Sequence, residues 1–262
     1  MTEAPSSAAR PGSSTGRVIR WILGLQVAIA ILMMGGDLLR VAPTMLPGSP
    51  APGLDLPVSP GDQTRRYTPR LAPGEPPSGP GFPGDGRVPR RLTWATAQIA
   101  GAPALLLTGA IVPGDAARFA DYLDGLENRP DTVALHSPGG SVRDALEIGR
   151  RLRAEGLETH VGPEAACFSA CPYILAGGVR RTVSRTAMVG VHQHYFGEKA
   201  ILPAFMAVED IQRAQADVMT YLDAMGIDPL LMVKAMQTQP DDIYILVESE
   251  LEGFALATEL AD

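Results

Sequence analysis

A serine, a histidine and a pair of glycines lie in the second half of the sequence at spacings that could support nucleophilic chemistry. A nucleophilic serine needs a base for its proton, a group that orients the base, and donors for the oxyanion that forms. Ser169 and His192 could supply the nucleophile and the base. Gly139 and Gly140 stand between an apolar run and an amphipathic run, where glycine lets backbone N–H groups approach a ligand. These residue types indicate a hydrolytic site.

Short apolar runs alternate with amphipathic stretches after residue 90, a pattern typical of βα units on a parallel sheet. We therefore expect an α/β fold with repeated ββα units and a mostly parallel sheet. Residues 132–136 are predicted to form a buried strand that ends before the glycine pair, and Ser141 begins the next helix. The other predicted elements are strands at 93–99, 104–111, 159–162, 181–183 and 187–192, and helices at 115–126, 173–178, 203–225, 229–236 and after Ser249.

The serine is predicted to lie at the start of a helix. Proline is tolerated in a first helical turn, and Pro172 follows Ser169 by three residues. The N–H of Ala170 would then lie beside the serine as a donor, and the helix dipole would favour negative charge there. This position suits a developing oxyanion.

The motif order HSPGGSV, CFSACPYILAGG and MVGVHQ resembles the ClpP/crotonase superfamily, specifically its ClpP-like serine peptidases, over most of residues 104–256. The resemblance implies that Ser169 is the nucleophile, that His192 is the base, and that Gly140 and Ala170 supply the oxyanion donors. Gly139 would line the binding site. The resemblance also implies a homo-oligomer, a peptide or protein substrate and no cofactor.

The acid and the base each have a rival. The downstream pattern DDIYILVESELEGFAL looks like the family's aspartate-bearing strand, which favours Asp242 as the acid, with Asp241 as the alternative. This pair could instead only cap a turn after Pro240. His194 lies on the same side of its strand as His192 by two-residue alternation, so it is the rival base.

The lysines and cysteines suggest further alternatives. The related signal-peptide peptidases use a serine and a lysine, but neither Lys199 nor Lys234 stands in a setting that suggests a buried amine. Cys167 and Cys171 are the only cysteines. Helical i,i+4 spacing would leave their Cβ atoms about 5–6 Å apart, so a disulfide requires Cys167 to lie outside the helix. Otherwise they are two small buried residues, and two cysteines alone do not make a metal site.

The N-terminus predicts a membrane segment. Residues 21–36 include sixteen uncharged residues, preceded by Arg10, Arg17 and Arg20. We expect an uncleaved signal anchor, with a cleaved signal or a core helix as alternatives. The positive residues place the N-terminus in the cytoplasm, so the C-terminal domain would lie outside, in the periplasm of a bacterium with the helix in its inner membrane.

Composition sets the predicted domain organisation and excludes one class of partner. Thirteen of the 24 prolines fall between Pro43 and Pro89, which predicts a disordered linker. The expected regions are a cytoplasmic tail at 1–17, a membrane anchor at 18–41, the linker at 42–90 and a catalytic domain at 91–262. A net charge of −7 without a basic stripe argues against nucleic acid. Other functions considered are a non-catalytic scaffold and a crotonase-type acyl-CoA enzyme.

Overall fold

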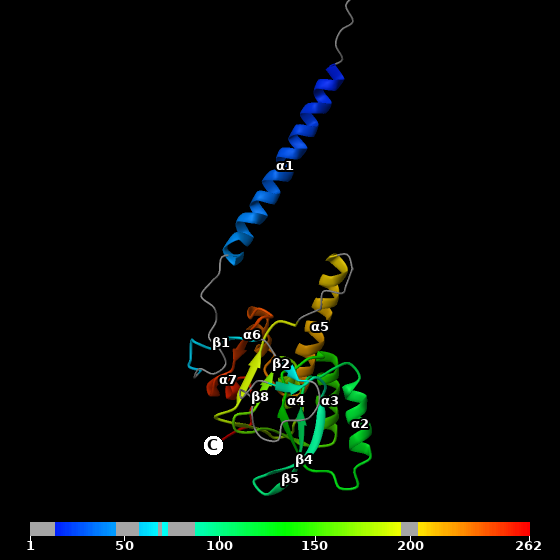
Figure 1. The fold of residues 1–262 in the computed structure, drawn as a ribbon, viewed down its shortest axis with the longest axis vertical. Helices are drawn as coiled ribbons and strands as arrows, with labels where there is room; N and C mark the ends of the chain where they lie inside the picture. Colours follow the sequence, from blue (N-terminus) through cyan, green and yellow to red (C-terminus); the bar gives the residue numbers. More distant parts are fainter. Residues whose placement is uncertain (1–13, 46–57, 68–69, 73–86, 195–203) are drawn as a thin grey trace, which may run out of the picture. The chain divides into compact units, whose positions relative to one another are not determined.

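The computed structural model describes residues 14–45, 58–67, 70–72, 87–194 and 204–262. The chain divides into two compact units, Met1–Pro50 and Ala51–Asp262, which are considered separately (Figure 1). Residues 1–13 of the expected tail, much of the expected linker and Lys199 lie outside the described residues.

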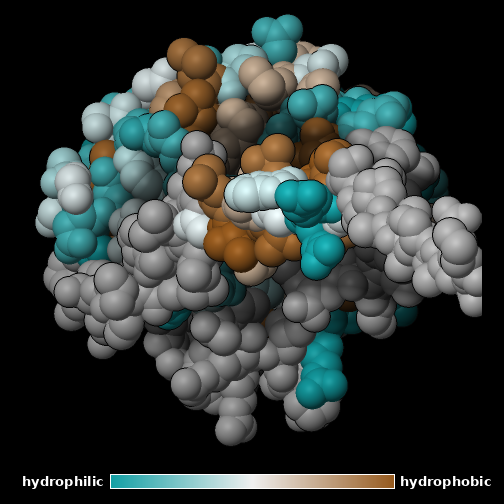
Figure 2. Space-filling view, turned by 90° about the horizontal axis from the view of Figure 1, so that it is seen from above, coloured by the Kyte–Doolittle hydropathy of each residue, from teal (hydrophilic) through white to brown (hydrophobic). Residues whose placement is uncertain are grey.

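Helix α1 (Ser14–Met45) is the element of the first unit. Within it, Gly16–Gly35 has 20 residues with a mean hydropathy of 2.0, and at 1.5 Å per residue it matches the hydrocarbon core of about 30 Å. Its apolar side chains are exposed, Trp21 at 79%. Seen from above, the surface carries a patch of apolar side chains beside polar ones (Figure 2). The helix is a candidate membrane span or signal sequence, and this exposure argues against a core helix.

A mostly parallel sheet of six strands forms the centre of the second unit, in the order β12-β9-β7-β6-β5-β4. Only the edge strand β4 runs antiparallel to its neighbour, β5. The strands are β4 (Thr93–Ile99), β5 (Ala102–Thr108), β6 (Thr132–His136), β7 (Glu158–Val161), β9 (Arg181–Ser184) and β12 (Glu259–Ala261). The predictions for 93–99 and 132–136 are confirmed to the residue. The parallel α/β architecture follows from the alternating pattern.

Helices follow β5 and β6 directly and pack with the sheet into one apolar core. Phe119 and Leu123 of α2 and Ile148 and Leu152 of α3 are fully buried together with the strand residues. Ser141 caps α3 with its side chain, which accepts from the N–H of Asp144, as expected for a helix that begins there. The helices are α2 (Asp115–Asp124), α3 (Val142–Ala154), α4 (Cys171–Ala176), α5 (Ala204–Ala224), α6 (Leu231–Gln237) and α7 (Glu248–Gly253).

A second sheet of four strands, in the order β1-β11-β10-β8, positions the site. Strand β8 (Ala166–Phe168) runs parallel to β10 (Met188–Val191), so the residues that follow them emerge at the same edge. Strand β11 (Asp242–Ile245) runs antiparallel to β10, so its first residues reach that edge too. Strand β8 is only three residues long, which is why the sequence pattern does not predict it.

Part of the region predicted to be a disordered linker, residues 42–90, instead forms short strands. Strand β1 (Thr64–Arg66) pairs with β11, and β2 (Arg70–Ala72) pairs with β3 (Arg87–Pro89). The Arg65 side chain is 0% exposed and Val88 is equally buried. The folded unit therefore includes described residues before position 91, because these short segments gain their stability by pairing rather than from local propensity.

Helices α3 and α4 approach each other at two glycines. A Cβ on Gly177 would lie 2.4 Å from the Gly149 carbonyl oxygen and 2.5 Å from its Cα. Backbone atoms at that distance cannot move aside as a flexible side chain can. The contact fixes α4, which follows Ser169 directly, against α3.

We predict that Gly177→Ala lowers the free energy of unfolding by about 1–3 kcal/mol, because overpacking forces backbone shifts. Urea unfolding of the full chain in detergent, followed by circular dichroism, measures this. Gly253→Ala is the matched control, since nothing lies within 4 Å of a Cβ there; its effect should stay within about 0.5 kcal/mol. Equal stability of the two variants would contradict the prediction.

Candidate active site

Ser169 occupies a strained turn between β8 and α4. Its φ is +59°, a left-handed conformation that residues other than glycine adopt rarely. Its N–H donates to the Gly190 carbonyl of β10 at 2.9 Å. Helix α4 begins at Cys171, with Pro172 in its first turn, so the serine precedes a helix start as expected. Strain of this kind is found at functional sites.

His192 follows β10 and lies beside the serine. Its Nε2 is 2.8 Å from the Ser169 Oγ, and its Nδ1 is 2.9 Å from the Pro240 carbonyl oxygen. A carbonyl oxygen can only accept, so Nδ1 carries the ring proton and Nε2 is left as the acceptor of the serine hydroxyl. This is the tautomer that a general base requires.

Burial lowers the pKa of His192. The residue is 9% exposed. Desolvation outweighs the effects that raise this pKa, which are the hydrogen bonds to the Pro240 and Asp242 backbone and the negative charge of Asp241. The imidazole is therefore neutral at neutral pH. A neutral ring can take a proton from Ser169.

The two candidate acids lie near His192, but neither carboxylate accepts the hydrogen bond from its Nδ1, which goes to the Pro240 carbonyl. The Asp242 carboxylate is 3.6 Å from the Arg66 guanidinium, its partner across β1 and β11. Asp241 acts on His192 through its charge. The hydrogen bond that orients the imidazole is accepted by the Pro240 carbonyl, and the role of Asp242 as the acid stays a prediction.

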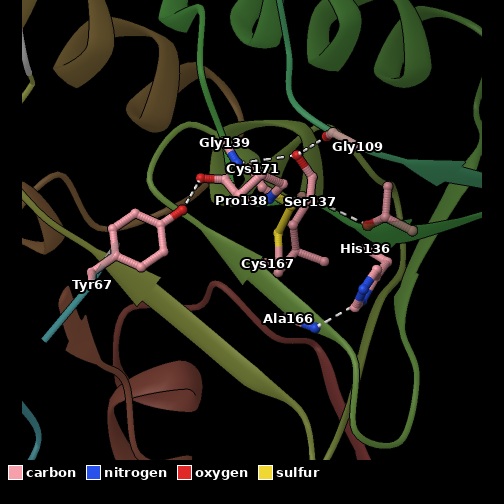
Figure 3. The surroundings of a disulfide bond; sticks show 11 residues. Tyr67, Gly109, His136, Ser137, Pro138, Gly139, Ala166, Cys167 and Cys171 are labelled. Atoms are coloured by element: carbon pink, nitrogen blue, oxygen red, sulfur yellow. Dashed lines mark hydrogen bonds between the residues drawn. A yellow bond between two sulfur atoms is a disulfide. The ribbon is translucent and has the colours of Figure 1, made fainter. Parts of the chain in front are cut away.

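A tight turn at residues 137–140 carries the two glycines. The Ser137 hydroxyl donates to the Gly109 carbonyl at 2.7 Å and accepts from the Gly139 N–H at 3.1 Å (Figure 3). The Gly139 carbonyl accepts from the Ile111 N–H at 2.8 Å. In a trans peptide the N–H points opposite to the carbonyl, so the Gly140 N–H faces away from Ile111. Ser137, which sequence reasoning did not select, thus helps to set the direction of the Gly140 N–H.

Neighbouring atoms approach Gly139 and Gly140 so closely that neither position has room for a side chain. A Cβ on Gly139 would lie 2.5 Å from the Ser169 Cβ and 2.7 Å from the Ala170 nitrogen, and one on Gly140 would lie 2.1 Å from the Ile111 oxygen. Their φ values are +88° and +139°. Within the described part of the chain, neither the Gly140 N–H nor the Ala170 N–H donates to another group. Two backbone N–H donors, next to the two turns that meet at Ser169, are thus free to bind another group.

A disulfide joins Cys167 and Cys171, with their Cα atoms 5.1 Å apart. Cys167 belongs to strand β8 and lies outside α4, which satisfies the condition that the sequence set for a bridge. Ser169 is the middle residue of the loop that this disulfide closes; Figure 3 shows the bridge itself. The bridge ties the strand before Ser169 to the helix after it.

Two of the other described histidines, His194 and His136, form hydrogen bonds to groups other than Ser169. His194 Nε2 lies 2.8 Å from the Tyr173 hydroxyl, and burial, with a smaller effect of the His192 charge, lowers the pKa of His194 to about 4. His136 Nδ1 accepts from the Ala166 N–H at 3.2 Å, and burial lowers its pKa to about 4. The structure thus gives the serine contact to His192 and not to its rival His194.

Lys234 forms its hydrogen bonds to groups other than Ser169. Its ammonium lies 3.0 Å from both the Tyr244 hydroxyl and the Glu250 carboxylate, and these hydrogen bonds raise its pKa. A lysine base needs a depressed pKa, so this residue does not fit a serine–lysine site. Among the described residues, no group of three or more His, Cys, Asp or Glu side chains could hold a metal ion.

Comparisons with known proteins find a likeness among solved structures. No family model and no curated protein matches the chain. Among solved structures, a point mutant of ClpP1 from Listeria monocytogenes matches with a TM-score of 0.47 and 17% sequence identity, over 61% of this chain and 91% of that one. The chemistry assigned to this chain below therefore rests on its own geometry.

We predict that replacing both cysteines by alanine lowers the free energy of unfolding by about 2 kcal/mol, the loop-closure term for so short a loop. Urea unfolding of the full chain with and without a reductant measures it: reduction should destabilise the native protein and leave the double variant unchanged. Alkylation of the unfolded, unreduced protein should add nothing to either cysteine. Two adducts before reduction would contradict the bridge.

Proposed function

We propose that this protein is a serine hydrolase, most specifically a ClpP-like peptidase, with Ser169 as the nucleophile and His192 as the base. The observation that carries the proposal is the 2.8 Å hydrogen bond between Ser169 Oγ and His192 Nε2, with the opposite ring nitrogen held by a carbonyl. A serine is activated when it is hydrogen-bonded to a base that is itself held by an orienting acceptor. The free N–H groups of Gly140 and Ala170 complete them.

The proposed reaction follows from these positions. His192 Nε2 accepts the Ser169 proton as Oγ attacks the peptide carbonyl carbon, and the carbonyl oxygen becomes an oxyanion that accepts from Gly140 and Ala170. The imidazolium then gives its proton to the leaving amine, and the C–N bond breaks to leave an acyl-enzyme. Water, deprotonated by His192, attacks the ester and releases the acid and the serine.

In this proposal two groups share the role of the acid in a Ser-His-Asp triad. The Pro240 carbonyl supplies the hydrogen bond that fixes the tautomer, and the nearby negative charge of Asp241 stabilises the imidazolium. Asp242 would act as the acid if its carboxylate exchanged Arg66 for His192. Because the carbonyl already orients the ring, we expect Asp242→Asn to be milder than loss of His192.

The proposed location is outside the cytoplasm, on a membrane anchor. Helix α1 is long enough to span a membrane, and arginines precede its apolar part, which supports an orientation with the folded unit on the outer side of a bacterial inner membrane. The Cys167–Cys171 bridge supports an oxidising compartment such as the periplasm. A homo-oligomer and a peptide or protein substrate stay predictions.

A fluorophosphonate probe tests the reaction class. We predict that the full chain in detergent is labelled once, that Ser169→Ala abolishes labelling, and that His192→Asn slows it at least about 100-fold. Ser249→Ala, at an exposed serine of α7, is the matched control and should be labelled like the wild type. An unlabelled wild type would overturn the hydrolase proposal and favour a scaffold, or a crotonase-type enzyme if acyl-CoA bound instead.

The rate of labelling should depend on pH through His192. Protonation removes the acceptor at Nε2, and burial holds the pKa of His192 below its ordinary value of about 6.5. We therefore predict a rate that rises about tenfold per pH unit at low pH, has its midpoint below 6.5, and is flat above it. His160→Asn, a control histidine on β7, should keep this profile. A midpoint at or above 6.5 would refute the assignment.

A further inference from the structure

The chain segment that precedes the α/β core contributes a strand to the active-site sheet. Strand β1 pairs with β11 in register, Arg65 with Ile243 and Arg66 with Asp242. Gln63 is buried, and its side-chain amide donates to the Ile245 carbonyl at 2.9 Å and to Glu250 at 2.6 Å. The strand is therefore held by backbone and side-chain bonds, and the residue that follows it has a defined place.

That residue, Tyr67, is 6% exposed and reaches both halves of the site. Its hydroxyl donates to the Pro138 carbonyl, in the turn that carries Gly139 and Gly140, and Figure 3 shows the ring pointing at this turn. Its ring stands edge-on to the His192 imidazole, with centroids 5.4 Å apart and an interplanar angle of 89°.

A third contact comes from the Tyr67 backbone. Its N–H donates to the Asp241 carbonyl at 2.9 Å, directly after the Pro240 carbonyl that holds His192 Nδ1. The ring also packs edge-on against Phe168, the residue before the nucleophile, at 5.5 Å. One residue thus contacts the oxyanion turn, the base, the residue that follows the acceptor of the base, and the strand of the nucleophile.

We propose that Tyr67 is a positioning residue of the active site, so that the segment before the α/β core completes the catalytic centre. The inference rests on the proposed function and extends it to a residue that makes no contact with the reacting atoms. The hydroxyl holds the Pro138 carbonyl and so keeps the neighbouring Gly140 N–H aimed at the oxyanion. The ring covers His192 and fixes its plane.

The two parts of the side chain act separately and can be removed separately. Burial raises the pKa of Tyr67, so its hydroxyl stays protonated and remains a donor at any working pH. Tyr67→Phe keeps the ring and removes only this donor. Tyr67→Leu removes the ring and exposes the imidazole to water, which relieves the desolvation that holds down the pKa of His192.

The groups that act electrostatically on His192 are unchanged by either substitution. Asp241, just before β11, acts on His192 through its charge, and Asp242 acts through its backbone. The other charged or titratable groups nearby are Arg66, opposite Asp242, and His194, two residues along the chain. A change in the pKa of His192 in these variants therefore reports the lost ring.

The test measures labelling of the full chain by the fluorophosphonate probe across pH. Tyr67→Phe should lower the second-order rate constant about tenfold, the scale expected for a misplaced donor, without moving the pH midpoint. Tyr67→Leu should lower the rate further and move the midpoint up toward about 6.5. Tyr221→Phe is the matched control, since its buried hydroxyl also donates to a backbone carbonyl, that of Tyr173 at 2.6 Å. It should cost similar stability and leave rate and midpoint unchanged.

The outcomes separate a positioning role from a merely structural one. If both Tyr67 variants, compared as folded protein, label within twofold of the wild type and keep its midpoint, the proposal is overturned. It is equally overturned if Tyr221→Phe slows labelling as much as Tyr67→Phe does. If the wild type is not labelled, the hydrolase proposal fails, and an NMR titration of His192 in wild type and Tyr67→Leu still decides whether the ring controls the base: an unchanged pKa rejects the inference.

Discussion

The contact between two backbone turns is the constraint on which the rest of this site depends. The turn at residues 137–140 lies so close to the serine that Gly139 has no room for a Cβ. Two backbone N–H groups can converge on one point only if the turns that carry them touch. That contact requires glycine in the first turn and a left-handed serine in the second, and each is an unfavourable local choice that the surrounding sheet, helix and disulfide must outweigh.

The framework around this contact is built to resist movement. Strand β8 is joined to helix α4 by the disulfide, α4 is fixed against α3 at Gly177, and the Ser137 side chain clamps the opposite turn to Gly109. The His192 ring is held through a backbone carbonyl rather than a flexible side chain, which leaves it few alternative positions. Preorganised donors and acceptors of this kind reduce the reorganisation that a charged transition state would otherwise demand.

Sequence patterns predicted the parts of this arrangement that depend on local chemistry. The alternating apolar runs located β4 and β6 to the residue, and Pro172 placed Ser169 before a helix start. Motif resemblance selected Ser169 and His192, which the structure brings within hydrogen-bond distance, although their catalytic roles stay predictions. The Pro240 carbonyl was not predictable, because every residue carries the same backbone acceptor and only the fold selects one.

Strand β1 shows a different limit of sequence reasoning, and it also bears on how the molecule is made. Three residues in a proline-rich region give no periodic signal, and they become a strand only by pairing with β11. The bond from Gln63 to Ile245 spans 182 positions of sequence, so it cannot form until synthesis has passed Ile245. Contacts between such distant segments close late in folding, because the entropy of the intervening loop must be lost first. Ser169 would therefore acquire its full surroundings as one of the last events of folding, and a ribosome-bound chain that ends before Ile245 would lack them.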